Sequence, residues 1–593
     1  MRHRTLDSHP AESTDLSTRD DIIAHHAAGK LLQLFVERIS GHRRDEDGKA
    51  FLAELVELHN TGVIDVLEPA RSIATYPLST HEFFLVQSVY VDVIPTLQAE
   101  VPAMLAAVKA LVARAGDDLA SGRPNGAFRL WAENSDRARA LLALADPGTP
   151  DDAAYIYLGL LALSKTEPEV ALDRAITLLA SRGLAGRLGA AKALGTLPLG
   201  TVEARSRSLD SLEAAHRAGA DDNLLGHIIA AAVDIVRSVP TEEAKVVKLI
   251  DAIAADAGDQ SIHHAVSTLM FHADDLAPAI VIPLTRIAHK TRIENIGTLD
   301  RLDGAAAQFL SRARVDEALA LVVPLLTAHE ELSSLEKLDS FAHGLLGLDG
   351  ERLARIIVTW LLSLNQNLGE AARSLVGNSH RDPIILEFDA DALALPEEGT
   401  IVLAHRAIGF LFMYPITAAS MILSLVRTAS AEGCQLIEEI LFEPLLINFS
   451  GELANWLKAK AADETDPTLP TIKRLLTRLE DYLEGVRRVG RINELRPSER
   501  ERLIESHRQQ ESMRQAHKEA EKRSVFLSIV SRSVILYGIR SISYFQGLDG
   551  KKQRNEMKLH SFSHSFEAPR LDIIEPFELD YTLRVFRAMK EAP

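Results

Sequence analysis

One short run decides how this chain folds: Arg187-Leu188-Gly189-Ala190-Ala191-Lys192-Ala193-Leu194-Gly195-Thr196-Leu197. Alanine and leucine are strong helix formers, so the run predicts a helix. Its small residues would let neighbouring helices approach closely, and its three leucines would fill the seam between them. The run therefore predicts closely packed helices.

The same rhythm extends from this run in both directions. Apolar residues recur at three- and four-residue spacing, and each such stretch ends in a short break that holds Gly, Pro, Asp, Ser or Thr. Loops this short join antiparallel helical neighbours. Helices are predicted near residues 153–164, 168–181, 186–197, 202–218 and 223–237, and the rhythm returns over 315–376.

Residues 186–197 resemble the second helix of a HEAT-type repeat, through the small residues and leucines quoted above. The resemblance covers about one repeat, and the rest of the chain matches by rhythm alone. It implies an α-solenoid, in which each repeat contacts only its neighbours. The sequence thus predicts a mainly α protein: an irregular HEAT-like α-solenoid with a small C-terminal block that contains a β-hairpin. An irregular helical bundle is the alternative.

Composition divides the chain into successive parts. The predicted parts are a disordered tail (1–16), an α-solenoid (17–395), its apolar helical C-terminal end (396–485), a charged linker helix (498–523) and a small block of β-hairpin plus terminal helix (524–593). A helix start at Ser17 with Asp20 leads into the first predicted helix, which ends at Gly41.

The last hundred residues differ in character from the rest. Ser498 and Glu501 predict a capping box ahead of a helix that is polar nearly all round. Beyond that helix, β-branched and aromatic residues predict strands, and a glycine-rich turn follows them. The predicted elements are strands over 525–530, 534–545 and 555–566, a turn over 547–550, and a helix over 577–590 with Leu579, Leu583, Phe586 and Met589 on one face.

Composition also limits the class of protein. Only 5% of the 593 residues are aromatic, which argues against a large β-sandwich or barrel. The formal net charge of −18 opposes nonspecific binding to nucleic acid or anionic lipid over most of the surface.

The single cysteine, Cys434, rules out an internal disulfide and a Cys-based zinc site and favours a reducing compartment. The polar N-terminus argues against a secretory signal, so we expect a cytoplasmic protein.

The longest apolar stretch, residues 407–426, lies at the margin of what a membrane helix needs. It contains Pro415 and several hydroxyl side chains. We therefore expect a buried solenoid helix, with a partner-facing helix as an alternative, and no membrane association.

The familiar catalytic patterns are missing from the sequence or incomplete. No phosphate-binding glycine loop occurs. The triplet at 380–382, His-Arg-Asp, lacks the Asn of a kinase catalytic loop five residues on.

The adjacent histidine pairs at 25–26 and 263–264 point about 100° apart on a helix, which does not suit one metal ion. His560 and His564 would lie roughly 13 Å apart on a strand, too far for a shared metal. Asp389 with Asp391 and Cys434 are weak candidates for catalysis, so we predict no catalytic residue, no metal site and no cofactor.

One contrast in charge singles out the C-terminal block. Residues 496–560 hold 14 Lys or Arg against 8 Asp or Glu, a balance of +6, so the rest of the chain carries −24. Basic groups among aromatics can contact phosphates and stack on bases. The candidate binding residues are Lys551, Lys552, Arg554, Tyr537 and Tyr544. The same block could instead dock on the acidic part of its own chain or on a protein partner.

Three functions follow from these patterns. The leading prediction is a non-enzymatic scaffold or adaptor that binds a protein partner through its helical-repeat surface. The second is a nucleic-acid-associated subunit that uses the basic C-terminal block. The third is an enzyme whose site is assembled from residues far apart in the sequence.

Overall fold

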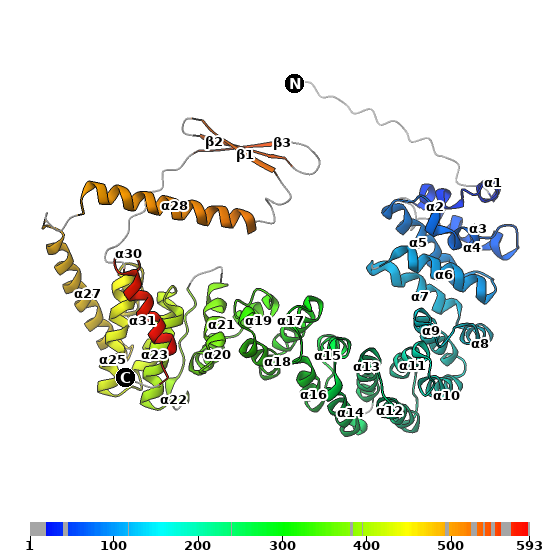
Figure 1. Ribbon diagram of the computed structural model, residues 1–593, viewed down its shortest axis with the longest axis horizontal. Coiled ribbons are helices and arrows are strands. Elements are labelled where there is room, and N and C mark those ends of the chain that lie inside the picture. The colour runs from blue at the N-terminus through cyan, green and yellow to red at the C-terminus, as the bar shows by residue number, and fades with distance from the viewer. Residues whose placement is uncertain are drawn as a thin grey trace. The chain divides into compact units, whose positions relative to one another are not determined.

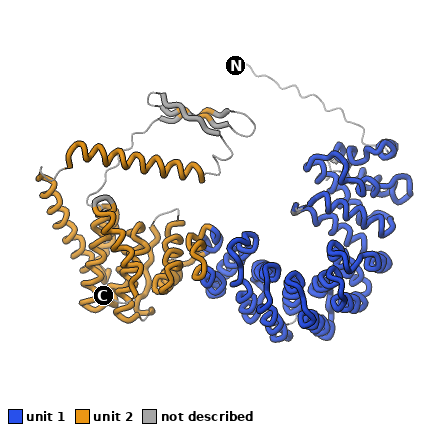
Figure 2. The backbone as a smooth tube through the Cα atoms, viewed as in Figure 1, with its two compact units in different colours: residues 1–325, 337–344 blue, residues 326–336, 345–593 orange. Residues whose placement is uncertain are grey.

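The computed structural model describes most of the chain. The described residues are 19–39, 46–116, 118–238, 240–379, 383–393, 395–492, 497–523, 531–537, 540–546, 552–558 and 571–590. The predicted tail at 1–16 lies outside them. The described chain is mainly α-helical and forms two compact units, residues 1–325 with 337–344 and residues 326–336 with 345–593 (Figure 2). The boundary between the units falls inside the segment predicted as one solenoid.

The first unit consists of short helices joined by tight turns. Its α-helices are α1 (Arg19–Ala27), α2 (Leu31–Ile39), α3 (Glu46–Asn60), α4 (Leu67–Arg71), α5 (Thr80–Val93), α6 (Val101–Ala115), α7 (Arg123–Trp131), α8 (Ser135–Leu144), α9 (Ala153–Ser164), α10 (Pro168–Leu179), α11 (Leu184–Thr196), α12 (Val202–Arg217), α13 (Asp222–Ser238), α14 (Glu243–Asp256), α15 (Asp259–Phe271), α16 (Pro278–Ala288) and α17 (Ile296–Ser311). Helices α18 (Val315–Ala328) and α19 (Asp339–Leu346) run across the unit boundary. The five helices predicted between 153 and 238 are confirmed, with ends within two residues.

The N-terminal prediction of a single helix is wrong. Two helices, α1 and α2, replace it because Gly29 adopts a positive φ of 68° between them. This left-handed conformation ends a helix and is open to glycine without steric cost.

From α9 to α17 the helices form two rows. Each odd-numbered helix packs on the next odd-numbered one, and the even-numbered helices from α10 to α16 form a second row (Figure 1). We call these the odd row and the even row. Each helix therefore meets the helix two places away in sequence, at a separation of about 36 residues in the contacts described next.

Small residues allow close contact within the odd row. A Cβ atom on Gly195 of α11 would lie 2.7 Å from the Cα atom of Ala231 on α13. A Cβ atom on Gly189 would lie 2.6 Å from the carbonyl oxygen of Ala153 on α9. Both contacts are with backbone, which cannot move aside as a flexible side chain can. The quoted run thus packs as predicted, with its glycines at the tightest contacts.

Ion pairs join successive helices of the even row. Asp173 of α10 pairs with Arg207 of α12, and Asp210 of α12 pairs with Lys245 of α14. Arg286 of α16 lies 2.5 Å from Asp251 of α14. The partners are 34, 35 and 35 residues apart in sequence. We call these three pairs the even-row ladder.

The second unit contains the most apolar helices. Its α-helices are α20 (Gly350–Leu362), α21 (Gln366–Gly377), α22 (Ala390–Leu393), α23 (Glu397–Leu411), α24 (Pro415–Val426), α25 (Ala431–Ile440), α26 (Glu452–Lys460), α27 (Leu469–Val489), α28 (Glu499–Arg523), α30 (Leu571–Ile574) and α31 (Pro576–Ala588). A π-helical segment, Leu441–Leu446, follows α25. The apolar stretch at 407–426 is split between α23 and α24, and most of both helices is buried. Every helix in the described part of the chain is too short or too polar to cross a membrane.

The last helix, α31, packs against α23 in the second unit. Arg406 of α23 is only 2% exposed. Its guanidinium donates hydrogen bonds to the carbonyl oxygens of Leu361, Ser363 (3.0 Å), Arg587 (2.5 Å) and Met589 (3.4 Å). This one side chain therefore ties the end of α20 and the end of α31 to α23.

Further contacts support the docking of α31. Arg587 donates to the carbonyl oxygen of Gly409 at 2.6 Å, and a Cβ atom on Gly409 would lie 2.8 Å from the backbone nitrogen of Arg587. The rings of His405 and Phe586 meet edge to face with centroids 4.7 Å apart. Of the predicted apolar face, Leu579 is buried.

The capping box ahead of α28 is confirmed. The backbone N–H of Ser498 donates to Glu501 at 2.7 Å, and the N–H of Glu501 donates to the Ser498 hydroxyl at 3.2 Å. No residue of α28 is buried, as its polar pattern predicts.

Three antiparallel strands lie in the C-terminal block: β1 (Ser531–Tyr537), β2 (Arg540–Gln546) and β3 (Lys552–Lys558), in that order in one sheet. The prediction of one strand over 534–545 is wrong, because β1 ends at Tyr537 and β2 begins at Arg540. A run of β-formers does not by itself reveal where one strand ends and the next begins. The predicted strand at 525–530, the turn at 547–550 and the residues after Lys558 in the predicted third strand lie outside the described residues.

Close packing of the odd row predicts a penalty at Gly195. Substitution of alanine for glycine inside a helix normally stabilises it by about 1 kcal/mol. We expect Gly195→Ala instead to lower the free energy of unfolding by about 1–3 kcal/mol, because the new methyl group meets the backbone of α13. Urea unfolding followed by circular dichroism measures the change.

Gly200→Ala is the matched control, because no atom lies within 4 Å of a Cβ atom at Gly200. We expect it to stay within about 0.5 kcal/mol of the parent chain. A Gly195→Ala chain as stable as the parent would contradict close contact between α11 and α13.

Candidate functional site

The odd row carries a line of basic side chains at equivalent places in successive helices. They are Lys192 on α11, His227 on α13, His263 and His264 on α15, and Arg301 on α17. We call these five residues the cation row. Lys192, His227, His264 and Arg301 follow one another at intervals of 35, 37 and 37 residues. This spacing matches the offset between neighbours in the row, so side chains far apart in sequence come together.

The imidazole rings at the centre of the cation row touch one another. The ring centroids of His227 and His264 are 4.6 Å apart, and those of His263 and His264 are 6.5 Å apart. Gly226 makes room for this contact, since a Cβ atom there would lie 2.4 Å from Cδ2 of His264. His263 Nδ1 and the Thr298 hydroxyl lie 2.9 Å apart, within hydrogen-bond distance.

Burial and like charge act together on the imidazoles. Burial, followed by the positive charges of His264 and Lys192, lowers the pKa of His227 to about 4. Burial is also the main cause that lowers the pKa of His263 and His264. A neutral imidazole is therefore the main form of His227 at pH 7.

The ends of the cation row rest on aromatic rings. The Lys192 ammonium lies 4.6 Å from the centroid of Tyr157, and the Arg301 guanidinium lies 5.8 Å from that of Phe271. An aromatic face attracts a cation without neutralising it. Burial lowers the pKa of Lys192. Among the described residues, no carboxylate forms an ion pair with Lys192 or Arg301.

The cation row does not form a catalytic pair. His263 and Thr298 resemble a base beside a hydroxyl nucleophile. Thr298, however, has no exposed surface, so its hydroxyl cannot meet a substrate. Within the described residues no three His, Cys, Asp or Glu side chains are placed to hold a metal ion. The arrangement is instead suited to anion binding.

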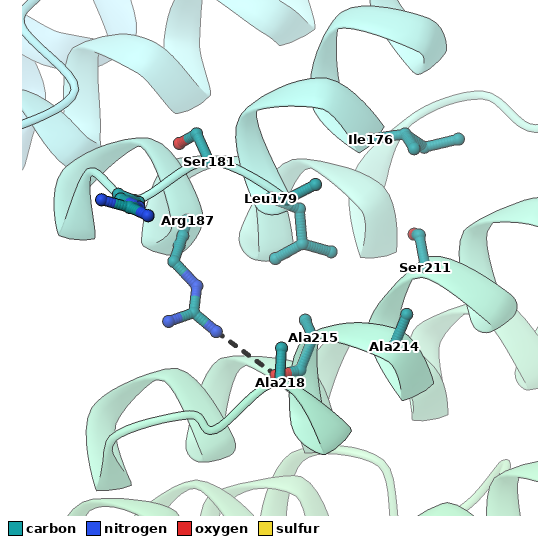
Figure 3. Close-up of a pocket in the computed structure, with 10 residues that line it drawn as sticks. Ile176, Leu179, Ser181, Arg187, Ser211, Ala214, Ala215 and Ala218 are labelled. Carbon is teal, nitrogen blue, oxygen red and sulfur yellow. Dashed lines mark hydrogen bonds between the residues drawn. The ribbon is translucent and has the colours of Figure 1, made fainter.

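A pocket of about 540 Å³ opens between α10 and α12 of the even row. Ile176 and Leu179 line one side, and Ala214 and Ala215 line the other (Figure 3). Arg187 enters the pocket and donates to the carbonyl oxygens of Ala215 (3.3 Å) and Gly219 (3.0 Å). Its guanidinium thus binds the C-terminal end of α12, a stabilising place for a cation.

A second, more apolar groove of about 510 Å³ lies between α16 and α18. Val281, Ile282 and Ala320 are among its lining residues. The pocket and this groove contrast with the backbone contacts of the odd row.

The sheet brings several of the C-terminal candidates together. Tyr544 on β2 lies opposite Arg554 on β3, and Gln546 lies opposite Lys552. Because opposed residues share a face and positions alternate along a strand, Tyr544, Arg554 and Lys552 occupy positions of one face. Tyr537, opposite Arg540, occupies the same face of β1. Arg554 is exposed and lies 2.9 Å from Glu556, and Lys551 lies outside the described residues.

The other sequence candidates stay apart from one another. The exposed Asp389 carboxylate, just before α22, accepts a hydrogen bond from the N–H of Asp391 at 3.1 Å. Burial raises the pKa of the Cys434 thiol, which disfavours the reactive thiolate. The triplet at 380–382 and both His560 and His564 lie outside the described residues.

Sequence reasoning considered His263 and His264 only as an adjacent pair and so missed the cation row. The signal was the recurrence of a basic residue at Lys192, His227, His264 and Arg301. An interval of about 36 residues becomes informative only when helices two apart are known to touch.

The depressed pKa of His227 predicts that the folded chain loses stability in acid. The unfolded chain takes up a proton on this histidine near pH 6.5, whereas the folded chain does so at a pKa of about 4. The unfolded state thus binds more protons in this window, and stability falls as the pH falls from 6.5 towards 4. We expect His227→Gln to reduce this loss by about 1–3 kcal/mol, measured by urea unfolding at pH 7.5 and 4.5.

His507→Gln removes a histidine from the exposed surface of α28 and is the control for the substitution itself. Equal pH dependence in the parent and the His227→Gln chain would show that His227 titrates normally when folded.

No family model matches the chain, and neither the curated proteins nor the solved structures contain a match to it. The function is therefore argued from the geometry of the chain's own residues.

Proposed function

We propose that this chain is a non-enzymatic scaffold or adaptor, built as an irregular HEAT-like α-solenoid, that binds a protein partner through the odd row. The observation that carries the proposal is the cation row, a line of basic side chains on one row of stacked helices. Stacked repeats present extended surfaces of this kind to other proteins.

The repeated contacts support the solenoid part of the proposal. Helices of α9–α17 meet their neighbours at a nearly constant sequence offset, both in the glycine contacts and in the even-row ladder. An irregular bundle has no reason to repeat its contacts at one interval.

The cations of the even row and those of the odd row have different neighbouring side chains. The even-row ladder pairs its cations with carboxylates, so those charges are already balanced within the chain. Lys192 and Arg301 on the odd row rest on aromatic rings instead. Unbalanced charge beside aromatic surface is typical of a protein interface, where aromatic residues and arginine are enriched.

Photo-cross-linking in the native host tests this proposal. Phe271 is 65% exposed beside the cation row and is replaced by the photoreactive residue p-benzoylphenylalanine. We expect illumination to join the chain to a discrete protein, identified by mass spectrometry, because the odd row is the proposed contact surface.

The same replacement at Val202, which is 57% exposed at the start of α12, is the control and should give no such product. Absence of a cross-linked protein from position 271, or an identical pattern from both positions, would refute the scaffold proposal.

A nucleic-acid-associated subunit is the second candidate, and the strand register favours it. Lys552, Arg554, Tyr537 and Tyr544 occupy positions of one face of the sheet. Arg540 and Lys558 are opposed in the same register and add two more basic positions to that face. Aromatic and basic groups on one face suit a single strand, whose bases stack while its phosphates are neutralised.

A charge reversal tests the second candidate. We expect Arg554→Glu to weaken binding to single-stranded oligonucleotides and to reduce the slope of log affinity against log salt by about 1. Fluorescence anisotropy over a salt series measures both quantities.

Arg532→Glu makes the same change in charge at a position of the opposite face, where Arg532 is opposed to Phe545. It should affect binding less than Arg554→Glu does. Absent or salt-insensitive binding by the parent chain would exclude this candidate.

A further inference from the structure

The cation row and the even-row ladder balance their charges differently. On the even row, Asp173, Asp210 and Asp251 each pair with a cation of the next helix. On the odd row, Asp221 and Asp222 lie near the imidazoles, but their carboxylates bond to backbone N–H groups. Asp222 accepts hydrogen bonds from the backbone N–H groups at the start of α15, including that of Gly258 at 2.9 Å. Among the described residues, Lys192 and Arg301 thus have no carboxylate paired with them, on a chain with a net charge of −18.

The cation row crosses four successive helices, α11, α13, α15 and α17. Packed helices lie about 8–10 Å apart, so the row spans roughly 25–30 Å. An extended peptide covers this span with about eight or nine residues at roughly 3.3 Å each. The length of the row thus fits one short extended segment that lies across the helices.

We infer that the cation row binds an extended acidic segment of a protein partner, with carboxylates on Lys192 and Arg301 at the ends and on the imidazoles between them. This inference rests on the proposed scaffold function and specifies the chemistry of its partner. Carboxylates supply the charge that the row lacks, and charge-assisted hydrogen bonds are stronger than neutral ones. The rings of Tyr157 and Phe271 add apolar surface at the two ends.

A short acidic peptide fits this surface better than a nucleic acid does. Duplex DNA carries a charge about every 1.7 Å along its axis and continues far beyond 30 Å. It would therefore meet the surrounding surface of a chain whose net charge is −18. A segment of eight or nine residues ends where the cation row ends and avoids this repulsion.

Proton uptake should accompany binding. His227 faces His264, Lys192 and, with the opposite sign, Asp221. His264 faces His263, Lys192, Arg301 and, with the opposite sign, Asp222. A bound carboxylate would raise the pKa of these imidazoles by favouring their charged forms. Glutamate, with an ordinary pKa of about 4.3, stays ionised at pH 5.5. The affinity should therefore rise as the pH falls from 7.5 to 5.5.

Fluorescence anisotropy with the full chain tests the inference. The probe is a labelled nonapeptide in which five glutamates alternate with serines, and its counterpart carries glutamine in place of glutamate. We expect the glutamate peptide alone to bind, several-fold tighter at pH 5.5 than at pH 7.5, and more weakly in high salt.

Two double variants locate the binding site. Lys192→Met with Arg301→Met should weaken binding at least about tenfold, because each removes a charge-assisted contact. Lys245→Met with Arg286→Met removes the same two charges from the even row and should change the affinity less than about twofold. Circular dichroism confirms that each variant is folded.

Four results would overturn the inference. The first two are no binding of the glutamate peptide at about 1 mM and an equal loss of affinity in the two double variants. The other two are no increase in affinity at low pH and tighter binding of a single-stranded oligothymidylate at the same residues. Cross-linking from position 271 to a partner in the absence of peptide binding would leave the scaffold proposal standing without this inference. Peptide binding without any cross-linked partner would support the acidic-segment site and contradict the scaffold proposal.

Discussion

Contact between helices two apart in the chain is the interaction on which the rest of the first unit depends. It requires small residues at fixed places, and Gly195 and Gly189 supply them where one backbone meets the next. The contact sets an offset of about 36 residues between the helices that touch. The ion pairs of the even row and the imidazole contacts of the odd row both follow from this offset, since each joins residues that the stacking brings together.

Among the described residues, basic side chains of the even row form ion pairs between helices, but those of the cation row do not. The even row uses its cations to join neighbouring helices, and an exposed ion pair of this kind stabilises a protein by at most about 1 kcal/mol. The odd row holds its helices together by apolar burial and close backbone approach. His263 and Arg301 add hydrogen bonds between α15 and α17, to Thr298 and Ser267, while burial of the histidines lowers stability in acid.

The sequence predicts local elements well when the signal is local. Helix periodicity identified α9–α13, and the pair Ser498 and Glu501 identified the start of α28. The helix break at Gly29 and the end of β1 at Tyr537 were missed, because a single glycine or a strand end barely changes the apolar pattern around it. The cation row was missed for a different reason. Its members come from four helices, and their proximity depends on which helices pack together, a property that no single window of sequence contains.

The order of synthesis gives the docking of α31 a further consequence. Arg406 donates to the carbonyl oxygen of Arg587, which lies 181 residues later in the chain. A ribosome that adds about 5–20 residues per second needs roughly 10–40 s to make that intervening segment. For most of this interval α23 has been made without the helix that packs on it, and the apolar surface that meets α31 is open to chaperones or to other nascent chains. The C-terminal end thus determines when the second unit can finish folding, although it contributes only a small part of its mass.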